Sequence, residues 1–235
     1  PYGSRSFDVV YEFTRQSVRK LFDMGCPLVI LACNTASAKA LRSIQMKDLP
    51  MWDPENRVLG IIRPTVEQIG ELTKTRHVGI LGTEGTIQSK SYPIEISKLF
   101  PDITVTGKAC PLFVPLVENS EYDSDGADYF VQKYLSELLE KDNQIDTIIL
   151  GCTHYPLLLP KIRKFVPEKM KIVSQGEIVA KSLADYLKRH TEMESKLTKR
   201  GHCEFFTTES VEKFKKSASV FLHENSIDAM RISLE

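Results

Sequence analysis

Two segments of the chain repeat the same order of residues, and this repeat constrains the fold more than any other feature. The first covers residues 28–35 (LVILACNT) and the second covers residues 147–154 (TIILGCTH). In each, an apolar run ends in one small residue, followed by a cysteine, polar side chains and a helical pattern. Continuous apolar runs of this length are typical of strands covered on both faces of a sheet. The repeat therefore predicts two equivalent strand ends, each carrying a thiol: Cys33 and Cys152.

Strand and helix patterns alternate along the rest of the chain. Helical patterns cover residues 7–24, 36–44, 89–100, 125–140, 155–165, 177–189 and 210–220, with a further helix starting near Pro64. Strand patterns cover residues 28–32, 58–62, 77–81, 103–109, 145–150, 171–173, 203–207 and 232–234, and loops are predicted at residues 50–54 and 191–201. This alternation favours parallel α/β sheets. We expect two similar parallel-sheet α/β domains, with the active site in the cleft between them.

The domain boundaries follow from the two sets of strands. The first domain is predicted to hold residues 1–74 and 174–235, and the second to hold residues 75–173. The tail is assigned to the first domain because that domain is otherwise short of strands, so the chain would cross between domains twice. The sequence opens at Pro1 with a turn leading into a helix. An α/β domain rarely starts this way, and we expect an N-terminal segment to be missing from the sequence given.

Composition excludes several classes of protein. The 31 basic and 31 acidic residues cancel, which gives no electrostatic footprint for nucleic acid or an anionic membrane. No apolar run approaches the roughly 20 residues that a membrane-spanning helix needs, and no signal peptide opens the sequence. The five cysteines are irregularly spaced and form no C-x-x-C pair, so neither a disulfide framework nor a zinc site is expected. Reduced thiols in a cytoplasmic protein fit this pattern best.

The position of the paired cysteines predicts chemistry. Ligands of open α/β sheets bind beyond the carboxyl ends of the strands, and a helix N-terminus there stabilises a thiolate and can hold a carboxylate. The side chains of Asn34, Thr35 and Thr153 add polar groups beside the thiols. A single cysteine at a strand end is more often a small core residue, but two with matching polar neighbours favour a functional pair. The remaining cysteines are expected in the core or at the surface, namely Cys26, Cys110 and Cys203.

Four other residues stand where they could serve the same site. His154 could exchange a proton with Cys152, or it could cap the helix that follows. Thr83 and Thr86 come after another strand, where they could contact substrate or act as turn and N-cap residues. Glu118 could face a cleft or lie at a solvated helix end.

Five short motifs together resemble one family. They lie at residues 1–3 (PYG), 32–37 (ACNTAS), 81–83 (LGT), 110–118 (CPLFVPLVE) and 151–156 (GCTHYP). In this order they are similar to the glutamate racemases of the cofactor-independent aspartate/glutamate racemase superfamily. Related aspartate racemases usually carry Glu at the position of His154, which favours glutamate.

The resemblance implies a mechanism without cofactor or metal. Two α/β domains would close over glutamate, with Cys33 and Cys152 on opposite faces of its α-carbon. One thiolate would remove the α-proton while the other thiol delivers a proton, with Cys33 acting on D-glutamate and Cys152, assisted by His154, on L-glutamate. The residues expected to bind substrate are Pro1, Tyr2, Gly3, Asn34, Thr35, Thr83, Thr86 and Thr153. The resemblance further implies that the D-glutamate serves bacterial peptidoglycan, and that the protein can form a homodimer.

One departure from the family keeps alternatives open. Family members begin with a strand and an Asp-Ser-Gly motif whose Asp assists the first cysteine, and this motif is absent before Pro1. If the molecule began here, we would expect little activity and a catalytically impaired, amino-acid-binding fragment. An aspartate racemase or another superfamily member is the nearest alternative enzyme. A Cys–His hydrolase built on Cys152 and His154 is a third, although it leaves Cys33 without a role.

Overall fold

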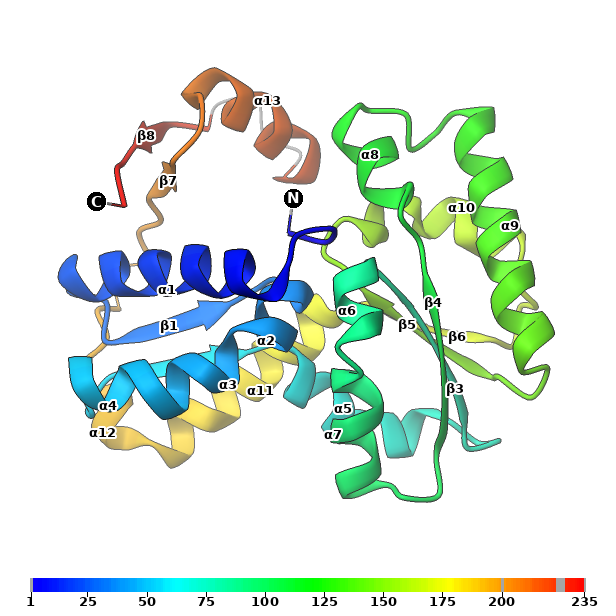
Figure 1. The fold of residues 1–235 in the computed structure, drawn as a ribbon, viewed down its shortest axis with the longest axis horizontal. Coiled ribbons are helices and arrows are strands. Elements are labelled where there is room, and N and C mark those ends of the chain that lie inside the picture. The colour runs from blue at the N-terminus through cyan, green and yellow to red at the C-terminus, as the bar shows by residue number, and fades with distance from the viewer. Residues whose placement is uncertain (1, 200, 223–226, 235) are drawn as a thin grey trace.

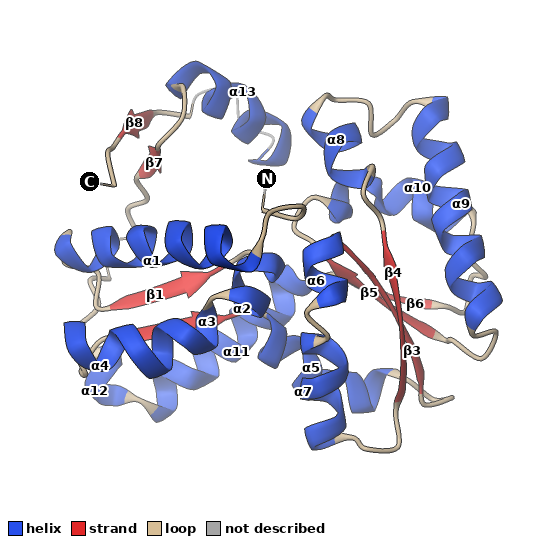
Figure 2. Cartoon of the chain, in the orientation of Figure 1, coloured by secondary structure: helices blue, strands red, loops and turns tan. Residues whose placement is uncertain are grey.

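The computed structural model describes residues 2–199, 201–222 and 227–234 of the chain (Figure 1). All of its strand pairs are parallel. One sheet pairs β1 (Leu28–Leu31) with β2 (Arg57–Gly60), and the other has the order β4–β3–β5–β6. Figure 2 shows the two sheets side by side, each flanked by helices. The predicted α/β class with parallel sheets is confirmed.

The smaller sheet packs under a long amphipathic helix. Helix α1 (Phe7–Asp23) begins at the N-cap Ser6 and buries Val18 against Val29 and Val58 of the two strands. These residues belong to the core of this half of the molecule. The apolar face of α1 packs on the sheet, as in an amphipathic surface helix.

The chain between β1 and β2 is more helical than the sequence predicts. It runs through α2 (Asn34–Lys39), α3 (Leu41–Ser43), a π-helical segment (Ile44–Asp48) and α4 (Leu49–Trp52). The loop predicted at residues 50–54 is therefore wrong for its first half. Pro50 lies in the first turn of α4, where its fixed φ suits a helical backbone.

The larger sheet is covered on both faces. Its strands are β3 (His77–Gly82), β4 (Thr104–Ala109), β5 (Thr147–Gly151) and β6 (Lys171–Val173). Helices α5 (Ile62–Leu72), α6 (Glu84–Gln88) and α7 (Ser91–Leu99) precede β4, and α8 (Phe113–Glu118), α9 (Asp125–Lys141), a 3₁₀ turn (Tyr155–Leu158) and α10 (Leu159–Lys164) follow it. The apolar runs of β3 and β5 are buried along almost their whole length, as strands between two helical layers must be.

The C-terminal tail adds a third, small sheet. It contains α11 (Gln175–Arg189), α12 (Thr191–Glu194), β7 (Phe205–Thr207), α13 (Val211–Leu222) and β8 (Ala229–Arg231). The loop predicted at residues 191–201 begins instead with α12, whose Met193 is buried. Strand β8 precedes the predicted residues 232–234, and it pairs with β7 rather than with the β1–β2 sheet. The proposed assignment of the tail to the first domain stays a prediction.

Helix α5 bears on the proposed domain boundary near residue 74. Its buried residues Ile62, Val66 and Ile69 pack in one cluster with Val78 of the larger sheet.

No helix in the described part of the chain is both long and apolar enough to cross a membrane.

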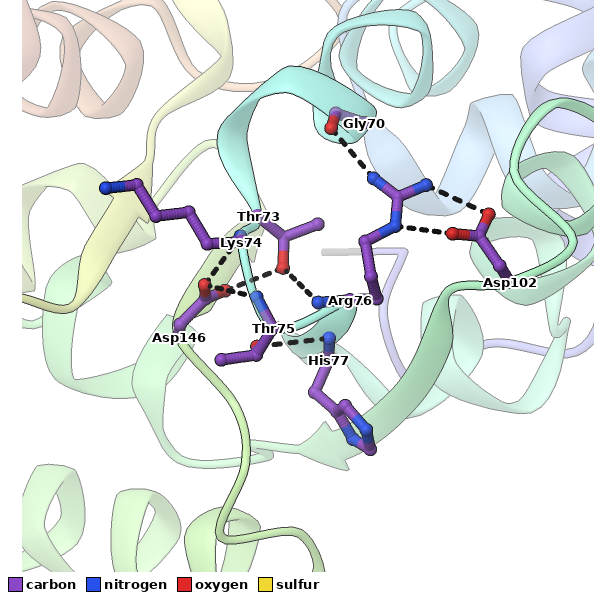
Figure 3. A network of polar contacts seen from close by, with 8 residues as sticks. All are labelled: Gly70, Thr73, Lys74, Thr75, Arg76, His77, Asp102 and Asp146. Atoms are coloured by element: carbon purple, nitrogen blue, oxygen red, sulfur yellow. Dashed lines mark hydrogen bonds and ion pairs between the residues drawn. The ribbon is translucent and has the colours of Figure 1, made fainter.

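The linker between α5 and β3 is held by one carboxylate (Figure 3). Asp146 accepts hydrogen bonds from the Thr73 hydroxyl at 2.7 Å, from the backbone N–H of Lys74 at 2.7 Å and from that of Thr75 at 2.9 Å. Burial alone would raise the pKa of Asp146, but these bonds lower it to about 2. The charged carboxylate therefore fixes the start of the larger sheet.

The Asp146→Asn variant should have a free energy of unfolding about 2 kcal/mol lower at pH 7, because a neutral amide loses the charge that strengthens these hydrogen bonds. The native pKa lies below the unfolded value, so this stabilisation is complete above about pH 5 and is lost as the pH falls from about 4 to about 2. Urea unfolding at pH 7 and pH 3 measures both effects. Asp102→Asn is the matched control, since Asp102 pairs with Arg76 at the exposed surface and should matter little. Equal stability of the two variants would contradict this role of Asp146.

Candidate active site

The functional side chains stand just beyond the carboxyl ends of β1, β3 and β5. Gly82 of β3 is in register with Gly151 of β5, so Thr83 and Cys152 leave the sheet side by side. Cys33 follows β1 and is the N-cap of α2, where its Sγ accepts a hydrogen bond from the Ala36 N–H at 3.5 Å.

Cys152 heads a chain of three polar side chains. Its Sγ lies 3.7 Å from Nδ1 of His154, and Nε2 of His154 lies 2.6 Å from Oε1 of Glu118, the last residue of α8. A carboxylate only accepts hydrogen bonds, so Nε2 carries the ring proton and Nδ1 presents a lone pair to the Cys152 thiol. The alternative role of His154 as a helix cap is wrong, because its side chain makes no capping bond.

The environment of Cys152 keeps its thiol protonated in the absence of substrate. Burial raises the pKa of Cys152 to about 12, opposed by the backbone at His154 and reinforced by negative charge on Cys33 and Glu118. A general base beside Cys152 is therefore needed before its sulfur can accept an α-proton, and His154 occupies that position.

Three threonine hydroxyls gather between the two halves of the site. Oγ1 of Thr35 lies 2.9 Å from Oγ1 of Thr83 and 3.3 Å from Oγ1 of Thr86, which are 3.1 Å apart. Thr83 is also the N-cap of α6, one of the two roles left open for it by the sequence, and it accepts a hydrogen bond from the Thr86 N–H. Hydroxyl groups can rotate to donate to an anion, so this cluster can serve a substrate carboxylate.

The remaining predicted substrate contacts are distributed around these groups. Gly3 packs so closely on Thr83 that an added Cβ would lie 2.8 Å from its side chain, and the Gly3 carbonyl accepts from the Gly85 N–H. Burial, and next the negative charge of Cys33, raise the pKa of Tyr2, which places its phenol near that sulfur. Thr153 is exposed, and its hydroxyl makes no hydrogen bond to the described residues. Pro1 lies outside the described residues.

The side chain of Asn34 is already engaged within the protein. Its Nδ2 donates to Oε1 of Gln175 at 2.6 Å, and its Oδ1 accepts from the Tyr92 hydroxyl at 2.7 Å. Asn34 is almost fully buried. The predicted contact of Asn34 with substrate can therefore use its backbone, the second proton of Nδ2 or the second lone pair of Oδ1.

The other cysteines match their predicted structural roles, and all five thiols are free. Cys110 lies in the core of the larger sheet, Cys26 packs against the core of the smaller sheet, and Cys203 is exposed. Within residues 2–199, 201–222 and 227–234, no group of three or more His, Cys, Asp or Glu side chains is placed to hold a metal ion.

A cavity of about 640 Å³ lies at the opposite edge of the larger sheet from this site. It is lined by residues at the amino ends of β5 and β6, among them Asp146 and Lys171, and by none of the predicted site residues. Four of the predicted site residues are themselves buried, namely Thr35, Thr83, Thr86 and Cys152. The three threonine hydroxyls lie within hydrogen-bond distance of one another.

The thiols should differ in their reaction with iodoacetamide. Exposed Cys203 should be alkylated first and half-buried Cys33 next, while Cys152 should react slowest in the site and accelerate as the pH rises toward its pKa of about 12. Peptide mass spectrometry over time at several pH values measures each rate. Faster labelling of Cys152 than of Cys33 at pH 8 would contradict the burial described here.

Sequence reasoning left Glu118 open and did not single out Tyr92 or Gln175. The signal for Glu118 is its place at the end of the 110–118 motif, but the helix turn that brings it to His154 is a tertiary feature. Tyr92 and Gln175 sit inside ordinary helical patterns, and only the packing of α7 and α11 makes them neighbours of Asn34.

Comparison with known proteins bears directly on this arrangement. The Asp/Glu/Hydantoin racemase family model matches residues 9–183. A glutamate racemase of Listeria monocytogenes is 37% identical over 235 residues, which are 100% of this chain and 85% of the relative. The crystal structure of a glutamate racemase isoform from Bacillus anthracis superposes with a TM-score of 0.88 at 33% identity, covering 100% of this chain and 84% of that one.

A second solved structure carries a ligand. The glutamate racemase from Francisella tularensis, in complex with D-glutamate, superposes with a TM-score of 0.86 at 28% identity, again over 100% of this chain and 84% of that one. The fold and the paired thiols thus define a racemase of the two-domain α/β class. The chain belongs to the Asp/Glu/hydantoin racemase family and, within it, to the glutamate racemases.

Proposed function

We propose that the protein interconverts L- and D-glutamate, with Cys33 and Cys152 as its two acid–base groups and His154 as the partner of Cys152. The proposal is carried by the series of polar contacts that links Cys152 to His154 and His154 to Glu118. A second thiol, that of Cys33, stands at the N-cap of α2. A relative of this fold is described in complex with D-glutamate, which supports glutamate as the substrate.

The protons balance as follows when L-glutamate reacts. Nδ1 of His154 takes the thiol proton of Cys152, and the thiolate removes the α-proton of the substrate. The Cys33 thiol then delivers its proton to the opposite face of the α-carbon, which leaves D-glutamate, a Cys33 thiolate, the α-proton on the Cys152 thiol and the transferred proton on His154. The reverse reaction starts from that thiolate, whose sulfur accepts a hydrogen bond from the Ala36 N–H.

The charge that develops on the substrate also needs stabilisation, because the α-proton of an amino acid is barely acidic. The hydroxyls of Thr35, Thr83 and Thr86 are held in contact with one another at the ends of the strands that carry the thiols, and Thr153 offers another hydroxyl. Donors that are already oriented in a dry site stabilise an enolate-like carboxylate more than mobile water does. The threonine cluster is therefore assigned to the α-carboxylate.

The chemistry also bears on where the protein works. Both cysteines must stay reduced to carry protons, which supports a cytoplasmic location. The product D-glutamate serves bacterial peptidoglycan. Homodimer formation stays a prediction.

The proposal is tested by incubating the protein with L-glutamate or L-aspartate and following both enantiomers by chiral chromatography. We expect D-glutamate to accumulate toward an equal mixture, with aspartate racemised at least about 100-fold more slowly, as expected when buried polar groups of a site lose their partners. Rapid racemisation of aspartate would make the protein an aspartate racemase. Saturable glutamate binding without racemisation would make it an amino-acid-binding protein.

A further inference from the structure

A closed ring of buried hydrogen bonds lies directly behind the site. Asn34 Nδ2 donates to Gln175 Oε1 at 2.6 Å, Gln175 Nε2 donates to the Tyr92 hydroxyl at 2.8 Å, and that hydroxyl donates to Asn34 Oδ1 at 2.7 Å. The three side chains are between 1% and 7% exposed. Each bond uses a different donor and acceptor, so all three form together without conflict.

The ring is anchored to the rest of the fold. Gln175 Nε2 also lies 2.8 Å from the hydroxyl of Thr65 on α5, which is fully buried. Burial raises the pKa of the Tyr92 phenol well above its usual value, so the hydroxyl keeps its proton and can donate. A fully paired network of this kind holds its members in one arrangement.

Tyr92 contacts both cysteine motifs. Through its hydroxyl it holds Asn34, the residue after Cys33, and its ring edge lies 3.5 Å from where a Cβ on Gly151 would stand, beside Cys152. Gln175 also links the two motifs. It follows β6, the strand that pairs with β5, and its Oε1 accepts a hydrogen bond from Asn34. The same ring therefore connects the residue after Cys33 with the residue before Cys152.

We propose that Tyr92 and Gln175 are positioning residues for racemisation, whose hydrogen-bond ring with Asn34 sets the placement of the Cys33 motif relative to the Cys152 motif. The inference rests on the proposed function. Two bases that act on opposite faces of one carbon tolerate little error in their separation, and a misplacement of about 1 Å can slow a reaction about 100-fold. Neither residue needs to touch the substrate in this role.

The test compares Tyr92→Phe with Tyr129→Phe. The first variant removes one hydroxyl from the ring and keeps the aromatic packing on Gly151, and the second removes a hydroxyl from an exposed tyrosine. We expect Tyr92→Phe to lower kcat about 10- to 100-fold with KM changed less than about threefold. We also expect a larger primary isotope effect with α-deuterated glutamate, since proton transfer becomes more rate-limiting. Tyr129→Phe should match the unsubstituted protein.

Gln175→Glu gives a second measurement if Tyr92→Phe does not fold. It keeps the shape and the bond from Asn34, but it loses the donor to Tyr92 and Thr65. Circular dichroism fixes the folded fraction, and rates are expressed per folded molecule. A lowered kcat with a raised isotope effect in a folded variant supports the proposal. An unchanged kcat and isotope effect, or failure of both variants to fold, would overturn it in favour of a purely structural ring. Absence of racemisation in the unsubstituted protein would refute the proposed function instead.

Discussion

Replacing Cys152 by serine should lower kcat for glutamate racemisation by at least about 1,000-fold, because positioned proton transfer contributes about 100- to 10,000-fold per group. A serine hydroxyl is a far weaker acid than a thiol, so His154 cannot convert it to a base that removes the α-proton. Cys33→Ser should have an effect of similar size. Chiral chromatography of each variant, with L- and D-glutamate as starting material, measures it.

The values of kcat/KM for the L-to-D and D-to-L reactions must fall together in either variant. Enantiomers have equal free energies, so the ratio of kcat/KM for the two directions is fixed at one whichever thiol is lost. Cys203→Ser is the matched control, since Cys203 is exposed and lies outside the site. Substantial racemisation by Cys152→Ser or by Cys33→Ser, with the control unaffected, would contradict the assignment of two thiol bases.

The second large effect should come from His154. The His154→Asn variant should racemise glutamate about 100-fold more slowly, because the Cys152 thiol, with its pKa raised to about 12, would lose its proton acceptor. The Glu118→Gln variant should racemise glutamate about 10-fold more slowly. A neutral amide still accepts a hydrogen bond from Nε2 of His154, but it no longer stabilises a positive charge on the ring. Steady-state rates between pH 6 and pH 10 measure both variants, and the His154→Asn defect should shrink as the pH rises.

A matched histidine pair provides the control for this experiment. His190 lies 3.0 Å from Glu192 near the surface and outside the site, in a contact between a histidine ring and a carboxylate like that of His154 with Glu118, so His190→Asn should leave the rate unchanged. A His154→Asn enzyme as active as His190→Asn at neutral pH would show that Cys152 loses its proton by another route.

The sequence predicts the parts of the site that lie at strand ends. Cys33, Thr83 and Cys152 each follow a buried apolar run, and parallel strands bring such positions to one edge of a sheet. It predicts the pairing of His154 with Cys152 because the two are neighbours in the chain. Contacts that depend on the packing of separate elements leave no such pattern in the sequence. The hydrogen bond between Glu118 and His154 is one of them.

Secondary structure shows the same division. The apolar runs of β1, β3 and β5 are found within one or two residues of their predicted bounds, because burial on both faces leaves a strong pattern. Residues 50–54 carry two prolines and look like a loop, yet a helical path already established from α2 continues through Pro50. Met193 gives a further example, since a single buried apolar residue in a polar run shows no periodicity.

The most direct test of two opposed thiol bases is the position of deuterium early in the reaction. L-Glutamate is incubated with the protein in deuterium oxide, and the α-hydrogen of each enantiomer is followed by NMR or mass spectrometry after chiral separation. We expect the first D-glutamate formed to carry deuterium at the α-carbon, delivered by the exchanged Cys33 thiol, while the remaining L-glutamate keeps its proton. Protium in the first D-glutamate, or deuterium entering L-glutamate as fast as D-glutamate appears, would contradict removal of the α-proton by Cys152 and delivery of a separate proton by Cys33.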